Sequence, residues 1–266
     1  MCGIAGFSLN PDSSVDRTLA AQALLAGISE RGADAVGYAQ RSSDGPVSVT
    51  KLRGGASALL DELEVPAQTA QALIHVRDFT KGHPEISANN HPIRHGHVVG
   101  IHNGIIENDD ALLARYRIER AEPQMTVDSE AIFALMEQRE HDPRALSEMR
   151  GAMAAAWMDE RDAETLFVAR GRLRPLWLGH SAEGLFFAST QRALAIVAAA
   201  LRTPLEVDDV KEGRLLHVVG GDVVRQRKFR PDRRYREPDV LPPVRTPREA
   251  VSALERFAAL ASNSPA

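Results

Sequence analysis

Cys2 is the first residue whose type and position could do chemistry. It is the only cysteine among 266 residues and directly follows Met1. Removal of an initiator methionine is favoured before a small residue, and the shortened chain would then carry an α-amine beside its own thiol. Such an amine titrates near ~7.7–8.0 and a thiol near ~8.5, so the amine can take the thiol proton at neutral pH. Cys2 is therefore a candidate nucleophile with its own base; the alternative is an inert small side chain.

Four histidines, His91, His95, His97 and His102, fall within a dozen residues. The two-residue spacing of His95 and His97 would put both side chains on one face of a strand, which makes a metal site conceivable. No Cys, Asp or Glu joins these histidines at the spacing that metal ligands need. We therefore expect no metal site.

Six motifs follow one another along the first half of the chain. They read MCGIAGF, RGADAVG, HVRDFTKG, NNHP, HNGIIEN and VDSEAI. This ordered set, over about residues 2–130, resembles the class II glutamine amidotransferases, whose glutaminase domains use an N-terminal nucleophile; it is most similar to the glutaminase half of glucosamine-6-phosphate synthases. A weaker likeness continues to about residue 228. The resemblance implies an α+β fold, a four-layer αββα sandwich of antiparallel sheets, and hydrolysis of L-glutamine without a metal or an organic cofactor.

The resemblance also implies a catalytic set. Cys2 would attack the δ-carbonyl of glutamine and form a thioester. The side-chain amide of Asn103 and the backbone N–H of Gly104 would hold the oxyanion, and loss of one such donor costs ~2.7–4 kcal/mol in other acyl-transfer enzymes. Both residues are expected in a loop that follows the apolar run 97–102, and an Asn-Gly pair taken alone is more often a turn. Arg31 would help to order the terminal residue.

Five further residues would bind glutamine, according to the same resemblance. Arg77 would bind the substrate carboxylate bidentately, and Asp128 would bind the ammonium group. Without the resemblance, Asp128 would be interpreted as the N-cap of the helical pattern that follows it. Thr80 and Gly82 would line the same pocket, within a mobile lid that excludes water. His91 would lie close to the site.

The chain departs from the glucosamine-6-phosphate synthases at one telling position. Those relatives have a tryptophan directly after the arginine that corresponds to Arg77, where it helps to close the site toward an ammonia channel; here the residue is Asp78. About 35 residues follow the glutaminase-like part, too few for an acceptor domain. We therefore expect a glutaminase subunit that serves a separate ammonia-accepting synthase or ligase. The alternatives are a free-standing amidase on glutamine or another γ-glutamyl compound, and a glutamine-sensing module without turnover.

Short apolar runs and helical patterns must position these residues. The apolar runs have the length of strands, and several follow one another in the second half of the chain, which favours antiparallel sheets with helices packed outside. Helices are predicted over about 16–30, 108–117, 128–140 and 190–201. The predicted amidotransferase domain covers 2–228.

The remaining residues, 229–266, are predicted to form a Pro/Arg-rich extended tail that ends in an amphipathic helix. Thr246 is the expected N-cap of this helix, with Pro247 at its first position. The apolar face of the helix could dock on its own domain or on a partner chain.

Composition excludes several classes of function. The net charge is -4, so nothing at the level of the whole chain asks for nucleic acid or an anionic membrane. The basic stretch 225–236 is followed by acidic residues and has few aromatic residues for base stacking, so it is expected to be a solvated surface. With one cysteine, no targeting segment and no long apolar run, the sequence predicts a cytoplasmic protein without membrane partners.

Overall fold

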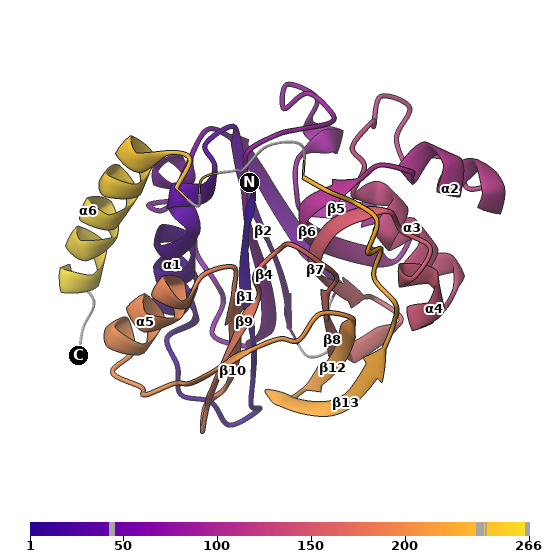
Figure 1. Ribbon diagram of the computed structural model, residues 1–266. Helices are drawn as coiled ribbons and strands as arrows, with labels where there is room; N and C mark the ends of the chain where they lie inside the picture. Colours follow the sequence, from indigo (N-terminus) through magenta and orange to yellow (C-terminus); the bar gives the residue numbers. More distant parts are fainter. Residues whose placement is uncertain (43–45, 238–241, 243, 264–266) are drawn as a thin grey trace.

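Two antiparallel sheets lie face to face, and helices cover the outer face of each sheet (Figure 1). The computed structural model describes residues 1–42, 46–237, 242 and 244–263. The predicted four-layer α+β sandwich is confirmed. Within the described residues, no helix combines the length and the apolar character needed to cross a bilayer.

The first sheet contains the strand that begins directly after the candidate nucleophile. Its strands are β1 (Gly3–Leu9), β2 (Ala35–Ser42), β3 (Ser48–Arg53), β4 (Thr69–Arg77), β9 (Trp177–Ser181), β10 (Gly184–Ala188) and β11 (Glu206–Asp209). Their order across the sheet is β11-β9-β10-β1-β4-β2-β3. The N-terminal strand therefore lies in the middle of the sheet, beside β4.

The second sheet faces the first. Its strands are β5 (Ile93–His95), β6 (Val98–Ile106), β7 (Gly151–Asp159), β8 (Asp162–Arg170), β12 (Arg214–Val219) and β13 (Asp222–Lys228). Their order is β13-β12-β8-β7-β6-β5, and every neighbouring pair is antiparallel. The sequence patterns predicted all of these strands except β5 and, in the first sheet, β11.

Three apolar cores explain why the strands have continuous apolar runs. Along β1, Ala5 and Phe7 pack in the core under the helices of the first sheet, whereas Ile4 packs in the core between the two sheets. A third core, which includes Trp157 and Phe133, fills the space between the second sheet and its helices. Because central strands are buried on both faces, alternation of apolar and polar residues is lost.

The helices form the two outer layers. Three of them cover the first sheet: α1 (Arg17–Ile28), α5 (Gln191–Ala200) and α6 (Pro247–Asn263). Three lie on the side of the second sheet: α2 (Asp109–Tyr116), α3 (Glu130–Gln138) and α4 (Pro143–Leu146). Short 3-10 helices are η1 (Ser29–Arg31), η2 (Ala56–Ala58) and η3 (Ser87–Asn89). The four internal helices predicted from sequence are confirmed, while α4 was not predicted because it is a single turn.

Helix α6 docks on the first sheet's helical layer. Ala253 and Phe257 are buried in the same core as α1. Pro247 is the first residue of α6 and Thr246 occupies the N-cap position, as predicted, since its carbonyl oxygen accepts from Ala250 N–H at 3.0 Å. The hydroxyl of Thr246 donates to the carbonyl oxygen of Ser29 at 2.9 Å, which ties the start of the helix to η1. The division of the chain at residue 228 stays a prediction, and residues 238–241, 243 and 264–266 of the predicted tail lie outside the described residues.

Candidate active site

The start of the chain lies at one end of the central strand of the first sheet (Figure 1). Gly3 pairs with Val76, so Cys2 and Arg77 lie next to one another at the ends of β1 and β4. Arg31, which is 2% exposed, donates from Nε to the carbonyl oxygen of Cys2 at 2.9 Å. This bond holds the backbone of the residue that carries the thiol.

The thiol of Cys2 faces the turn that follows β4. Its Sγ donates to the carbonyl oxygen of Asp78 at 3.5 Å. Burial raises the pKa of the Cys2 thiol, and the Asp78 hydrogen bond and the nearby N-terminal amine oppose this shift. A buried thiol needs an adjacent base to become a nucleophile at neutral pH.

The carboxylate of Asp78 holds two segments of the chain together. It accepts a hydrogen bond from the N-terminal amine of Met1 and forms an ion pair with Arg245 Nε at 3.0 Å. The carboxylate therefore connects the beginning of the chain to the segment just before α6. It offers no apolar surface that could close the site as an indole would.

Asn103 and Gly104 lie within strand β6, which corrects the prediction of a loop. Pairing with β7 continues without interruption from Val98 to Ile106, so backbone hydrogen bonding to β7 keeps both residues in the sheet. Asn103 is fully buried, and neither its amide nitrogen nor its amide oxygen has a hydrogen-bond partner among the described residues. Burial of an amide without a hydrogen-bond partner costs folding free energy, and such a group is a candidate for binding a ligand.

The conformation of Gly104 admits no other residue. Its φ is 152°, and a Cβ at this position would lie 1.9 Å from the carbonyl oxygen of Ala152. The close approach of β7 and the positive φ thus require glycine. The backbone at Gly104 is in this way fixed beside the unpartnered amide of Asn103.

Arg77 holds the segment that the sequence analysis interpreted as a lid. Its guanidinium is 2% exposed and donates to Asn90 Oδ1, to the carbonyl oxygen of Lys81 at 2.9 Å, and to the carbonyl oxygen of Gly82. Gly82 has a φ of 80°, which favours glycine. Thr80 is exposed, and its side chain makes no hydrogen bond with the described residues. In this structure Arg77 therefore orders the lid backbone.

Asp128 is a buried carboxylate that does not cap α3. Its Oδ2 accepts from the backbone N–H of Ile106 at 2.6 Å, and the residue is 3% exposed. The N-cap position belongs to Ser129, whose side chain makes no capping bond. Burial raises the pKa of Asp128 to about 6, while the hydrogen bond from Ile106 opposes this shift. Such a group gains most from a cation that enters its site.

A stack of buried histidines joins the two sheets beside these residues. His91 is 3% exposed and its ring stacks on His75 with 4.1 Å between centroids. His75 Nε2 lies 3.1 Å from the carbonyl oxygen of His102, and His102 Nδ1 lies 2.8 Å from Ser129 Oγ. Burial lowers the pKa of His75 and of His102 to about 3 and that of His91 well below its usual value. All three rings are therefore neutral at physiological pH.

His75 was not recognised from the sequence as a site residue. It lies two positions before Arg77 in β4, and residues at this spacing share one face of a strand. That spacing is the signal that could have placed it in the site. His95 lies in β5, but His97 lies in the turn after it, so the predicted pair on one strand face is wrong. Among the described residues, no three metal-ligating side chains are arranged to hold an ion.

An ion-pair network that the sequence analysis missed anchors the lid from outside. Lys81 Nζ lies 2.6 Å from Asp109 Oδ2 and 2.9 Å from Asp110 Oδ2 in the first turn of α2. Arg120 bridges the same two carboxylates to Glu130 of α3. The lid is thus fastened both by Arg77 from inside and by these carboxylates from outside.

Comparison with known proteins identifies the family of the domain. Residues 80–196, which include Asn103, Gly104 and Asp128, match the family described as "Glutamine amidotransferase domain". The chain is 27% identical over 221 residues to the glutamine–fructose-6-phosphate aminotransferase (isomerizing) of Halalkalibacterium halodurans, covering 79% of this chain and 34% of the relative. It is 32% identical over 206 residues to the protein of the same name from Shigella flexneri, covering 73% and 32%.

Solved structures share the fold. The glutamine phosphoribosylpyrophosphate amidotransferase of B. subtilis, complexed with ADP and GMP, superimposes with a TM-score of 0.68 at 19% identity, over 86% of this chain and 49% of that chain. The chain spans about a third of the length of the relatives compared by sequence. It carries a class II glutamine amidotransferase domain with the fold of the N-terminal-nucleophile hydrolases.

Proposed function

We propose that this domain hydrolyses the side-chain amide of L-glutamine to glutamate and ammonia, with Cys2 as nucleophile after removal of Met1. The observation that carries the proposal is Asn103, a fully buried amide whose polar atoms have no partner among the described residues, held beside Gly104. An oxyanion is the ligand that a preorganised amide N–H and a neighbouring backbone N–H suit best.

The proposed reaction has two steps. The α-amine of Cys2 takes the proton of its thiol, and the sulfur attacks the δ-carbonyl carbon to form a tetrahedral intermediate whose oxyanion is held by Asn103 and Gly104. The C–N bond then breaks, the leaving nitrogen receives the proton from the α-amine, and ammonia departs from a thioester. Water, deprotonated by the same amine, attacks the thioester and releases glutamate. Arg31 keeps the backbone of Cys2 in place through its carbonyl oxygen.

The substrate would be fixed by its amino acid end. Asp128 would bind the ammonium group, which relieves the cost of its buried charge. Arg77 would bind the carboxylate, and because it already bonds Asn90 and the lid, substrate and lid would share one guanidinium. Thr80 and Gly82 would complete the pocket from the lid, and His91 would line it as a neutral ring.

The released ammonia would pass to a separate synthase or ligase subunit. The relatives compared by sequence are aminotransferases of which this chain spans about a third, which fits a glutaminase part that works with an acceptor part. A free-standing amidase on glutamine or another γ-glutamyl compound is the second candidate; Asp78 favours it, because a carboxylate replaces the indole that closes the site toward an ammonia channel. A sensing module is less well supported, since it would need neither the thiol nor Asn103.

The test is glutamate release from glutamine by three forms of the purified protein. The form with a free Cys2 amine, verified by mass spectrometry, is expected to be active. Cys2→Ala and a form that retains Met1 are expected to be inactive, because one lacks the thiol and the other has a peptide nitrogen in place of the base. Equal urea unfolding curves for all three forms show that the fold is kept. Turnover by Cys2→Ala would reject the assignment of the nucleophile, and full activity with Met1 retained would reject the assignment of the base.

A further inference from the structure

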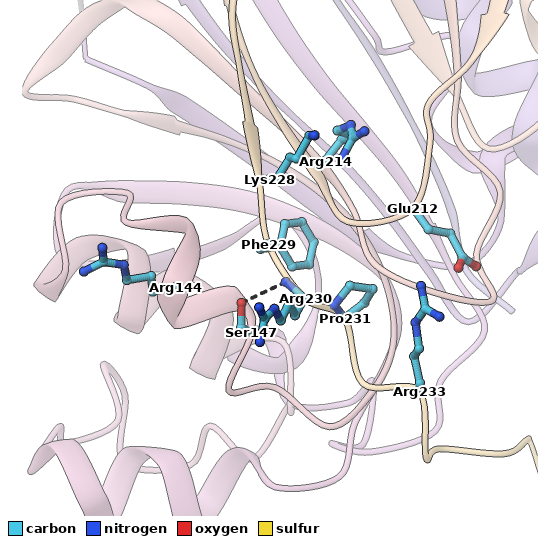
Figure 2. A pocket seen from close by; sticks show the side chains of 9 residues that line it. All are labelled: Arg144, Ser147, Glu212, Arg214, Lys228, Phe229, Arg230, Pro231 and Arg233. Atoms are coloured by element: carbon cyan, nitrogen blue, oxygen red, sulfur yellow. Dashed lines mark hydrogen bonds between the residues drawn. The ribbon is translucent and has the colours of Figure 1, made fainter.

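A basic groove is lined by residues of the second sheet and of α4 (Figure 2). Its main cavity has a volume of about 880 Å³. The cationic side chains that line it come from α4, β12, β13 and the segment after β13: Arg144, Arg214, Lys228, Arg230 and Arg233. Pro231 adds a partly exposed apolar side chain, Phe229 is buried in the core beneath, and Glu212 is the only acidic residue in the described lining.

The cations of the basic groove are unpaired within the described part of the chain. None of the five forms an ion pair with a described carboxylate, and Glu212 is 3.7 Å from a different cation, Arg172. Arg214 Nε is buried and has no hydrogen-bond partner among the described residues. The whole protein has a net charge of -4, so this concentration of unpaired positive charge distinguishes the groove from the rest of the chain.

The groove continues past the main cavity. A second cavity of about 580 Å³ shares Ser147, Arg230, Pro231 and Arg233 with the first. It adds the cations Arg115, Arg150 and Arg234 and the carboxylates Glu148 and Asp232, and Arg115 pairs with Glu148 at 2.9 Å. Ser147 Oγ accepts from the backbone N–H of Arg230 at 3.0 Å, which fixes the ridge between the two cavities (Figure 2). The second cavity is therefore of mixed charge, and the main cavity is the more strongly positive part of the groove.

Two residues of the basic groove lie in the same row of paired residues across the second sheet as Asn103 of the candidate active site. Asn103 pairs with Ala154, Ala154 with Arg170, Arg170 with Arg214, and Arg214 with Lys228. Four strand spacings of ~4.8 Å put Lys228 about 19 Å from Asn103 along this row. A molecule bound in the groove would thus lie about 19 Å along the sheet from Asn103, the candidate oxyanion residue.

The segment after β13, which lines the groove, is followed along the chain by a residue that contacts the surroundings of Cys2. The chain runs from Phe229 to Glu237, whose carboxylate forms a bidentate ion pair with Arg174, at 2.6 Å for both contacts. Arg174 is 4% exposed. Farther on, Arg245 pairs with Asp78 beside the start of the chain. One segment therefore contacts both the groove and the surroundings of Cys2.

We propose that the basic groove docks an acidic segment of a partner protein, namely the ammonia-accepting subunit. This inference rests on the proposed function for the identity of the partner, and on the unpaired cations for the chemistry of the contact. Several carboxylates along an extended segment would pair with Arg144, Arg214, Lys228 and Arg230, and the partly exposed Pro231 among these cations suits a polypeptide.

Two other anionic ligands fit the groove less well. A small phosphorylated molecule needs cations held in place by hydrogen bonds, whereas these long side chains are spread along two cavities and are not fixed by ion pairs. A single-stranded nucleic acid needs exposed aromatic rings for base stacking, and Phe229 is only 8% exposed.

The experiment measures binding of a fluorescein-labelled oligoglutamate peptide to the full chain by fluorescence anisotropy at low salt. The groove variant is Arg214→Glu with Lys228→Glu. The matched control is Arg202→Glu with Arg248→Glu, which changes the net charge by the same amount at two exposed positions, after α5 and in α6. A milder pair, Arg214→Gln with Lys228→Gln, serves if the reversal disturbs folding. The wild type is expected to bind, with at least about tenfold weaker binding in the groove variant and less than about twofold loss in the control.

Three results would overturn the proposal. They are absence of binding by the wild type, an equal loss in groove and control variants, and a preference for an oligonucleotide of the same charge or for inorganic tripolyphosphate over the peptide. Glutaminase activity is assayed on the same wild-type preparation. Peptide binding without glutamine turnover would reject the proposed glutaminase function but not the anion-binding groove. Glutamine turnover without peptide binding would reject the docking proposal but not the glutaminase function.

Discussion

Replacing Asp128 with asparagine is expected to stabilise the protein at neutral pH and to weaken glutamine binding. The carboxylate is buried, and its one hydrogen bond comes from the N–H of Ile106 at 2.6 Å. No described lysine, arginine or histidine forms an ion pair with Asp128; Lys81 and Arg77 act on its charge only from a greater distance, so an entering ammonium group would be its first direct partner. An asparagine can keep the bond to Ile106 through its amide oxygen and carries no charge.

The size of the effect follows from the pKa. Burial raises the pKa of Asp128 from an ordinary value of 3.8 to about 6. Each pKa unit corresponds to about 1.4 kcal/mol, so the charged form costs the folded state about 3 kcal/mol. Because the folded-state pKa lies above the unfolded-state value, this cost is fully present above about pH 6. It shrinks as the pH falls and is gone below the ordinary value.

Urea unfolding of the wild type and of Asp128→Asn across this pH range tests the argument. The variant is expected to be more stable by up to about 3 kcal/mol near pH 7.5, with a difference that vanishes near pH 4. The comparison between two proteins removes the contribution of the buried neutral histidines, which lowers the stability of both as the pH falls. Asp109→Asn is the matched control: Asp109 is equally buried but lies 2.6 Å from Lys81 and 3.1 Å from Arg120, so its loss should destabilise.

The result that would refute the reasoning is a variant less stable than the wild type near neutral pH, or a difference that does not change with pH. Kinetics give a second readout. In the wild type, kcat/KM for glutamine should fall as the pH drops through about 6, because protonated Asp128 cannot hold an ammonium group. The Asp128→Asn variant should not show this fall in kcat/KM at low pH, and its KM for glutamine should be high at every pH.

Three further substitutions test the surroundings of the site. Gly104→Ala would place a Cβ against the carbonyl oxygen of Ala152, and we expect urea unfolding to show a loss of at least about 3 kcal/mol; wild-type stability would contradict the backbone argument. Arg77→Lys replaces a fork that holds three acceptors with a single ammonium, so steady-state kinetics should show at least a tenfold higher KM for glutamine, and an unchanged KM would exclude this role. Lys81→Met removes a half-exposed partner of Asp109 and should cost about 1 kcal/mol in thermal unfolding with faster proteolysis of the lid; unchanged proteolysis would show that the ion pair does not hold it.

Antiparallel sheets with helices packed outside could be predicted from local sequence patterns, whereas the four-layer arrangement came from the family resemblance. The strand-length apolar runs and the helical periodicities are properties of short windows, and most of the predicted elements are present. The location of Asn103 could not be predicted in this way. Whether the chain leaves the sheet after His102 depends on β7, which lies some fifty residues farther along and pairs with β6 up to Ile106. Pairing between distant segments is invisible to a local pattern.

The same reason explains the partners that the sequence did not reveal. Arg245 lies 167 positions after Asp78, and no motif connects them, yet the fold puts their charged groups 3.0 Å apart. His75 and His102 belong to different sheets and meet only because the sheets face one another. The motifs supplied the candidate site residues, whose roles stay predictions, whereas the contacts around those residues had to come from the structure.

The distribution of unsatisfied polar atoms is the strongest physical argument that these residues form a binding site. Twelve buried side-chain nitrogen or oxygen atoms have no hydrogen-bond partner among the described residues, and five of them belong to Asn103, His75 and His91. A buried polar atom without a partner costs about 1–3 kcal/mol, so the fully buried amide of Asn103, with two such atoms, carries the clearest cost. Asn103 follows His102 in β6, whose carbonyl oxygen lies 3.1 Å from His75 Nε2, and His75 stacks on His91. A polar ligand that supplies the missing hydrogen bonds explains both the cost and its location.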